Sequence, residues 1–336
     1  MHLGAASGYH ARMFSYRHAF HAGNHADVLK HLTLIATLQH LMLKPTGLTL
    51  IDTHAGAGLY RLDSDFTATS GEAQDGIVKL AAATGGAAAK NSKSKQDLQL
   101  SSVKSSDDAT KPEATALQEY LALIRTFNTD GVLRVYPGSP FVMAQLLRTE
   151  ARDKLKLFEM HPTDSKLLAA NIAQLEAGRQ VAVTRQDGFE SLKALLPPPN
   201  RRALVLIDPS YELKQDYARV LTCMQDSLKR FPTGSYMIWY PVIPRPEAHD
   251  LPRRLKTLAT QNGRSWLHTT LAIGSEEATA TPLTAGEPRR PGLRASGVFV
   301  INPPHTLAAR LRESLPDVLA ALGRGAGKGW TVDAGG

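Results

Sequence analysis

The chain has 336 residues, of which 43% are hydrophobic, and a formal net charge of +8. This is enough for a large globular core and excludes a fibrous protein, and the charge is compatible with a polyanionic partner such as a nucleic acid. The sequence contains no run of about 18 apolar residues and no apolar secretory segment at its start, so we expect a soluble, cytoplasmic protein with no membrane partner.

Residues 22–43 carry the first predicted element, a long helix. Apolar side chains recur at helical spacing within "ADVLKHLTLIATLQHLM", and the Lys-Pro-Thr-Gly sequence at residues 44–47 ends the pattern. We therefore expect an amphipathic helix ahead of the first strand.

Four histidines of the N-terminal segment are candidate metal ligands, because neutral imidazole is a common one. These histidines are His18, His21, His25 and His31. Their spacing matches no compact site, and the single cysteine, Cys223, lies far away in a helical pattern. No metal is expected.

Seven short apolar runs predict the strands of a sheet. In chain order they are "LTLID", "LKLFEM", "QVAVTRQDG", "ALVLIDPS", "GSYMIWYP", "WLHTTLAIG" and "SGVFVINPP". Helical stretches separate the earlier runs, which predicts parallel strands covered by helices on both faces. The last two runs lack a crossover helix between them, which predicts an antiparallel hairpin on the sheet edge. The expected fold class is α/β with a seven-stranded sheet.

Nearly a hundred residues separate the first two strands, too many for one crossover, so we place a small helical insertion there. It contains the helical pattern "ATALQEYLALIRTFN" and an Ala/Ser/Lys-rich stretch that is expected to be a mobile surface loop. Ser139 is predicted to cap the helix that follows, and Pro140 to open it. The predicted divisions are a cap motif and helix at 1–47, a main domain at 48–59 and 139–325, an insertion at 60–138 with its loop at about 81–114, and a tail at 326–336.

Polar residues follow four of the predicted strands, and ligands of open α/β sheets bind at the carboxyl ends of strands. The groups are Asp52 to Gly58, Glu159, Asp187 with Gly188, and Asp208 to Tyr211. Gly56 permits a tight turn whose backbone amides approach a ligand, but the third glycine of the dinucleotide fingerprint is missing. Glu159 could accept hydrogen bonds from both ribose hydroxyls, and Asp187 could bind an adenine amine or cap a helix. Together these groups predict an adenosine-type cofactor, and S-adenosylmethionine fits better than a dinucleotide.

The fourth strand end indicates the reaction. Adenine N6 is a poor nucleophile, because its lone pair is delocalised into the ring. Catalysis therefore needs acceptors that bind both amine hydrogens, and we assign the Asp208 carboxylate and the Pro209 carbonyl. Tyr211 is predicted to stack on a base that has left its helix or loop.

A rival acceptor motif, Asn302-Pro303-Pro304, lies at the end of the last strand. It has His305 where the aromatic residue would stand. We expect its prolines to end an edge strand instead.

The sequence contains several long motifs, which are "FSYRHAFHAGNHADVLKH", "DTHAGAGLY", "YPGSPFVMAQLLR", "DGFESLKALLPP", "RRALVLIDPSYE" and "WYPV". Together they resemble the RlmJ family of bacterial 23S ribosomal RNA adenine-N6 methyltransferases. The resemblance covers roughly residues 13–325 apart from the Ala/Ser/Lys-rich loop. It implies a class I, Rossmann-like methyltransferase fold with a helical insertion, and a target adenine numbered 2030 in the reference 23S numbering. Residues 1–12 precede the usual start of the family, so Met13 is a candidate initiator.

The resemblance also implies residue roles, position by position. The cofactor would contact His31, His54, Ser139, Glu159, Asp187 and Gly188. Asp208 would be the catalytic residue, and Tyr16 and Lys30 would lie near the target base. The implied partner is naked or partly assembled 23S rRNA, and the expected oligomeric state is a monomer.

Ser210 departs from the family pattern, which has a second proline at this position. A proline there would restrict Pro209 to extended conformations, whereas serine removes that restriction and adds an N–H donor. A non-catalytic RNA-binding protein that retains the fold is therefore the alternative hypothesis. A nucleotide-dependent oxidoreductase, suggested by the glycines after the first strand, is a third.

Overall fold

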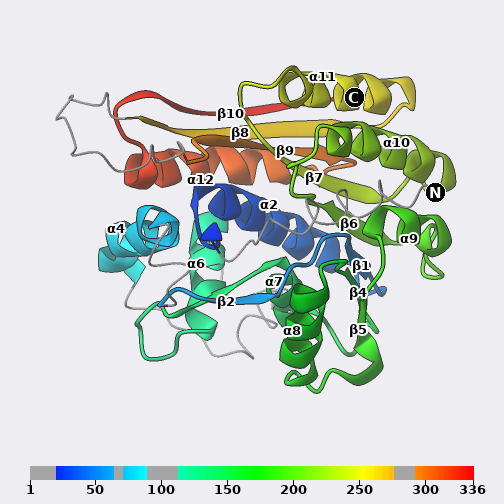
Figure 1. Cartoon of the computed structure of the whole chain (residues 1–336), viewed down its shortest axis with the longest axis horizontal. Coiled ribbons are helices and arrows are strands. Elements are labelled where there is room, and N and C mark those ends of the chain that lie inside the picture. Colours follow the sequence, from blue (N-terminus) through cyan, green and yellow to red (C-terminus); the bar gives the residue numbers. More distant parts are fainter. Residues whose placement is uncertain (1–19, 64–70, 89–112, 276–291) are drawn as a thin grey trace, which may run out of the picture.

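A computed structural model describes residues 20–63, 71–88, 113–275 and 292–336. Its main feature is an eight-stranded sheet in the order β10-β8-β9-β7-β6-β1-β4-β5 (Figure 1). The strands are β1 (Thr49–Asp52), β4 (Lys154–Phe158), β5 (Val181–Thr184), β6 (Ala203–Ile207), β7 (Ser235–Pro241), β8 (Trp266–Ser275), β9 (Ala295–Ile301) and β10 (Ala326–Gly335).

The pairs β5–β4, β4–β1, β1–β6 and β6–β7 are parallel. The pairs β7–β9, β9–β8 and β8–β10 are antiparallel. This mostly parallel sheet confirms the predicted α/β, Rossmann-like fold class. All seven predicted strands are present.

Two details of the sheet prediction are wrong. The predicted tail at 326–336 is mostly an eighth strand, β10, which pairs with β8 and forms the edge. Consequently the hairpin partners β8 and β9 are both interior strands, and β9 lies between β7 and β8. The sequence of β10 contains three glycines and alternates apolar and polar residues only from Trp330 to Ala334, so its conformation depends strongly on pairing with β8.

Helices cover both faces of the sheet, as the alternation of strands and helices predicts. In β6, Leu204 and Leu206 join the core cluster on one face, and Val205 and Ile207 join the cluster on the other. The first face is covered by α2 (His25–Met42), α7 (Ser139–Leu146), α8 (Pro162–Ala173) and α12 (Leu307–Leu322). The second face is covered by α9 (Gly188–Leu195), α10 (Gln215–Arg230) and α11 (Pro246–Gln261). A short 3-10 turn, η3 (Gly178–Gln180), precedes β5.

Helix α2 is buried on nearly all sides, so the prediction of an amphipathic helix is wrong. Every residue from His25 to Leu38 is buried, because α2 packs between the sheet and the helices α6 (Ala116–Thr126), α7 and α12. The Asn24 side chain caps the start of α2 by accepting hydrogen bonds from the Ala26 and Asp27 backbone amides. The polar residues of this helix must therefore find partners inside the protein.

The segment between β1 and α7 begins and ends in a small two-stranded sheet, β2 (Leu59–Arg61) with β3 (Val135–Pro137). Between them lie a π-helical turn, η2 (Gln74–Val78), followed by α4 (Lys79–Ala88) and α6. Part of the predicted mobile loop is thus helical, since residues 81–88 belong to α4. Its alanines favour a helix, and α4 packs against α12. Residues 89–112 lie outside the described residues, and the predicted division into domains remains a prediction.

The described helices include none that is both long enough and apolar enough to span a bilayer.

Candidate active site

A pocket lies at the carboxyl ends of β1, β4, β5 and β6. The chain runs outward from β1 to β4 and β5 and then returns to β6 on the other side of β1, so the strand order reverses there. Open α/β sheets bind ligands at this reversal point. The pocket is lined by Lys30, His31, Thr53, His54, Ala55, Gly56, Tyr60, Gly138, Ser139, Glu159, Met160, His161, Asp164, Asp187, Gly188, Asp208, Pro209, Ser210, Leu213, Asp216 and Arg219.

The structure brings together ten of the twelve residues that the sequence singled out. The two exceptions are Tyr211, which does not line the pocket, and Tyr16, which lies outside the described residues. The roles of the ten remain predictions, but their positions agree with one shared site.

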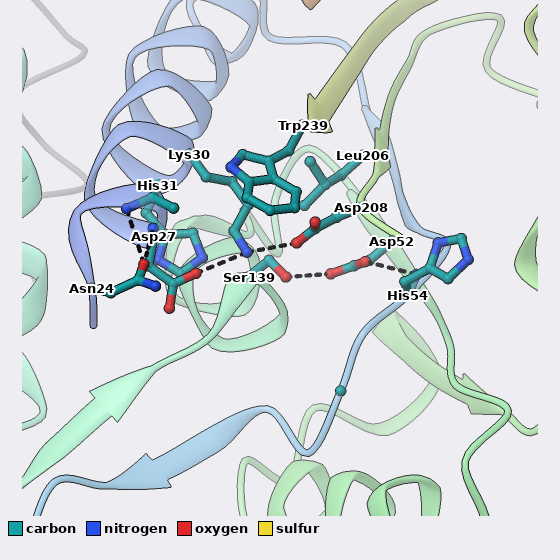
Figure 2. Close-up of polar contacts among 12 residues, drawn as sticks. Asn24, Asp27, Lys30, His31, Asp52, His54, Ser139, Leu206, Asp208 and Trp239 are labelled. Carbon is teal, nitrogen blue, oxygen red and sulfur yellow. Dashed lines mark hydrogen bonds and ion pairs between the residues drawn. The ribbon is translucent and has the colours of Figure 1, made fainter. Parts of the chain in front are cut away.

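Asp52, at the end of β1, is fully buried and binds two residues that line the pocket (Figure 2). Its Oδ2 accepts a hydrogen bond from Ser139 Oγ at 2.7 Å, and its Oδ1 accepts one from the His54 amide at 3.2 Å. Burial raises the pKa of Asp52 to about 6. Ser139 is therefore not the cap of α7 as predicted. Gly138 occupies the cap position, and the Ser139 side chain binds Asp52 instead.

Glu159, after β4, is held by two backbone amides. Its Oε2 accepts a hydrogen bond from the Gly56 amide at 2.7 Å, and its Oε1 accepts one from the His161 amide at 2.6 Å. Burial raises the pKa of Glu159 to about 7 despite these contacts. Gly56 has a φ of +60°, and a Cβ there would lie 2.4 Å from the Tyr60 hydroxyl. The turn after β1 therefore needs glycine at this position.

Asp187 caps α9, which was one of its two predicted roles. Its Oδ1 accepts a hydrogen bond from the Phe189 amide at 2.9 Å, and its Oδ2 accepts one from Arg219 of α10. The Arg219 guanidinium lies 4.6 Å from the centroid of the Phe189 ring. The His54 ring packs edge-to-face against the same Phe189 ring, with 4.8 Å between the ring centroids. Burial lowers the pKa of His54 to about 4, so this imidazole is neutral at physiological pH.

Gly188 lies in contact with the end of β1, and we expect Gly188→Ala to destabilise the protein. A Cβ at this position would lie 2.1 Å from the Thr53 carbonyl oxygen and 2.6 Å from its Cα. Because these atoms are backbone, α9 would have to move away from β1. The free energy of unfolding, measured by urea denaturation, should fall by about 1–3 kcal/mol. Gly329→Ala is the matched control, since a Cβ there meets nothing within 4 Å. Equal stability of the two variants would contradict this prediction.

A buried lysine joins two carboxylates beside the pocket (Figure 2). Lys30 Nζ lies 2.6 Å from Asp208 Oδ2 and 2.9 Å from Asp27 Oδ1. Burial lowers the pKa of Lys30, but the charges of Asp208 and Asp27 outweigh this effect and raise it well above its ordinary value. The ammonium also lies 5.8 Å from the centroid of the Trp239 ring.

Tyr211 does not form the exposed stacking surface that the sequence predicted. Its side chain is 2% exposed, and its hydroxyl donates a hydrogen bond to the Trp239 carbonyl oxygen at 2.7 Å. Its ring packs against Tyr217 at 4.6 Å, and its φ of +53° turns the chain inward after Ser210. Ser210 is exposed, and both Ser210 and the buried Pro209 line the pocket. The prediction of base stacking by Tyr211 is therefore wrong for this conformation.

His31 and the rival motif have structural partners. His31 is fully buried, and its Nδ1 lies 2.7 Å from the Tyr136 hydroxyl.

The Asn302 amide of the rival motif donates to the carbonyl oxygens of Pro232 and Gly234, at the opposite edge of the sheet from the pocket. The rival motif therefore lies away from the pocket, and it ends β9, which is an interior strand and not the predicted edge strand. No group of three or more potential metal ligands occurs within the described ranges.

Sequence reasoning missed several charged residues in or beside this pocket, among them Arg219, which lines it, and Asp27, which contacts Lys30. Arg219 comes from the middle of a helical pattern, and Asp27 comes from a helix expected to expose one face. Neither follows a strand, so the rule that identified the other polar residues could not find them.

Comparisons with known proteins agree with this geometry. Residues 45–93 and 88–334 match a family model described as ribosomal RNA large subunit methyltransferase D, RlmJ. Ribosomal RNA large subunit methyltransferase J of Haemophilus influenzae is 38% identical over 96% of this chain and 98% of its own length. The Escherichia coli protein of the same name is 37% identical over 90% and 92%. The crystal structure of protein LPL1258 from Legionella pneumophila aligns with a TM-score of 0.72 at 28% identity, covering 94% of this chain and 98% of that one.

Proposed function

The chain belongs to the RlmJ family of large-subunit ribosomal RNA methyltransferases, and from this premise we propose that it methylates N6 of an adenine in 23S rRNA. The proposed target is adenine 2030 in the reference numbering, and the proposed methyl donor is S-adenosylmethionine. The substrate is naked or partly assembled rRNA in the cytoplasm, and the enzyme acts as a monomer on a base flipped out of its helix or loop. The observation that carries this proposal is the Asp208 carboxylate at the reversal point of the sheet, in the same pocket as Glu159 and Asp187.

The residues of the pocket fit an adenosine-type cofactor. Glu159 presents a carboxylate beside the glycine turn after β1, where it can accept hydrogen bonds from ribose hydroxyls. A side chain is excluded at Gly56 in that turn, since a Cβ there would contact the Tyr60 hydroxyl. His54, Ser139, Asp187 and Gly188 would complete the binding site. When bound, S-adenosylmethionine supplies an electrophilic methyl group on its sulfonium.

Asp208 is arranged to accept a hydrogen bond from the target amine. Lys30 occupies its Oδ2, whereas no described residue donates a hydrogen bond to its Oδ1. The free oxygen and the Pro209 carbonyl can bind the two hydrogens of N6 as that nitrogen becomes pyramidal. The residues then act by positioning and by electrostatic stabilisation of the developing positive charge.

The test is transfer of labelled methyl groups to 23S rRNA from cells that lack the endogenous enzyme, followed by mass mapping of the modified nucleotide. We expect incorporation at a single adenine. Absence of incorporation, with Asp208→Ala indistinguishable from the parent protein, would refute the proposal.

Cofactor affinity should depend on pH through Glu159. Its pKa is raised by burial to about 7, so the carboxyl is mostly protonated at about pH 6 and ionised at about pH 8. An ionised carboxylate accepts hydrogen bonds from ribose hydroxyls more strongly than a carboxylic acid does. The Kd for S-adenosylmethionine, measured by calorimetry, should therefore fall about tenfold between these pH values. Glu159→Gln should bind more weakly at high pH and lose most of this dependence. An unchanged pH profile in that variant would assign the titration to another group, such as Asp52.

The alternative function is RNA binding without catalysis, and it rests on Ser210. This residue lines the pocket in place of the second proline of the family pattern and leaves Pro209 unrestricted. Binding of both cofactor and RNA without turnover would select this alternative. Restoration of turnover by Ser210→Pro would then identify its cause.

A further inference from the structure

Asp27 is a buried carboxylate beside the active site to which the proposed reaction assigns no role. Its side chain lies on α2 and is 2% exposed. It does not line the pocket, but it contacts Lys30, the residue that binds Asp208. Figure 2 shows the Lys30 ammonium between the two carboxylates.

The protein backbone holds Asp27 in a fixed place. Its Oδ2 accepts a hydrogen bond from the Gly23 amide at 2.9 Å, and its own amide donates to the Asn24 side chain at 3.0 Å. The Gly23 carbonyl accepts a further hydrogen bond from the Ile77 amide at 2.8 Å. The Asp27 Oδ1 atom is therefore a rigid acceptor at 2.9 Å from the flexible end of Lys30.

The three charged groups together carry a net charge of −1 when ionised. A lysine bound to one buried carboxylate alone would form a neutral pair and could swing between the two oxygens of Asp208. Shared with Asp27, the ammonium is directed to Asp208 Oδ2, and Oδ1 is left to accept. The net negative charge also favours the cationic character that develops on a methylated amine.

We propose that Asp27 is a positioning residue for methyl transfer. It holds the Lys30 ammonium on one oxygen of Asp208, so that the other oxygen faces the amine of the target base. This inference rests on the proposed function and adds to it a residue that acts from outside the pocket. A purely structural Asp27 would matter for folding only, and the folded fraction of an Asp27 variant would then turn over at the parent rate.

The test is Asp27→Asn, assayed for kcat, for the Michaelis constant toward the rRNA substrate and for the affinity for S-adenosylmethionine. We expect kcat to fall roughly 10- to 100-fold, with the Michaelis constant and the cofactor affinity within about twofold of the parent values. Asp27→Glu, which keeps the charge, should recover part of the loss. Asp153→Asn is the matched control, because Asp153 is also fully buried, binds the Leu48 amide and pairs with Arg148, but lies at the opposite ends of β1 and β4.

A double-mutant cycle separates positioning from structure. If Asp27 acts through Lys30, Asp27→Asn should change kcat by less than about twofold in a Lys30→Gln background. Additive effects on kcat, or a parent-like kcat in folded Asp27→Asn, would overturn the inference and leave the proposed function intact. If the double variant does not fold, the comparison of Asp27→Asn, Asp27→Glu and Asp153→Asn decides the question alone. Absence of methyl transfer by the parent protein would overturn both proposals.

Discussion

Replacement of Asp208 by alanine is expected to lower the rate of methyl transfer roughly 100- to 1000-fold, the scale of losing one preorganised contact to the transition state. The variant loses an acceptor for the target amine, while Lys30 keeps Asp27 as its partner, so the fold should survive. Single-turnover transfer of labelled methyl to 23S rRNA measures the effect.

Two further measurements make this result specific. The affinity for S-adenosylmethionine should remain within about threefold of the parent value, because the cofactor contacts assigned to Glu159 and Asp187 are untouched. Asp208→Asn keeps one acceptor oxygen and should retain more activity than Asp208→Ala. Transfer by Asp208→Ala at the parent rate would show that another group binds the amine.

Replacement of Lys30 by methionine should lower the free energy of unfolding by about 3–5 kcal/mol, as expected when one partner of a buried ion pair is removed. Asp27 and Asp208 would then share a buried site without a cation, their side chains being 2% and 13% exposed. Urea denaturation followed by circular dichroism measures the change.

The matched control is Lys193→Met. Lys193 and Glu190 also form an i,i+3 pair, but their side chains are 51% and 64% exposed. Because such surface pairs contribute little, this variant should lie within about 0.5 kcal/mol of the parent protein. Equal losses in the two variants would contradict the importance of the buried site.

The sequence predicted the seven strands and the location of the pocket, because both depend on local patterns. Short apolar runs such as that of β6 are buried on both faces, and polar residues directly after such runs must lie at the carboxyl edge of a parallel sheet. Glu159, Asp187 and Asp208 could therefore be assigned to one site without knowledge of the strand order.

The errors concern features that depend on tertiary contacts. Tyr211 is buried because its backbone adopts a positive φ and the Trp239 carbonyl binds its hydroxyl, and neither can be read from the local sequence. The cover over α2 comes from α6 and α12, which are distant in the chain, so its polar residues were expected on an exposed face. The importance of Asp27 could have been predicted only by asking which carboxylate forms an ion pair with Lys30.

The position of β10 affects how copies of this protein meet one another. Without it, β8 would expose a long row of unpaired backbone groups beside an apolar strand, the kind of surface that adds strands from other molecules. β10 occupies that row along nearly its full length and presents an outer edge containing Lys328, Asp333 and three glycines. Charged residues and glycines make a poor template for further pairing. We therefore expect β10 to limit edge-to-edge aggregation, and loss of residues 326–336 should reduce solubility even where the pocket is intact.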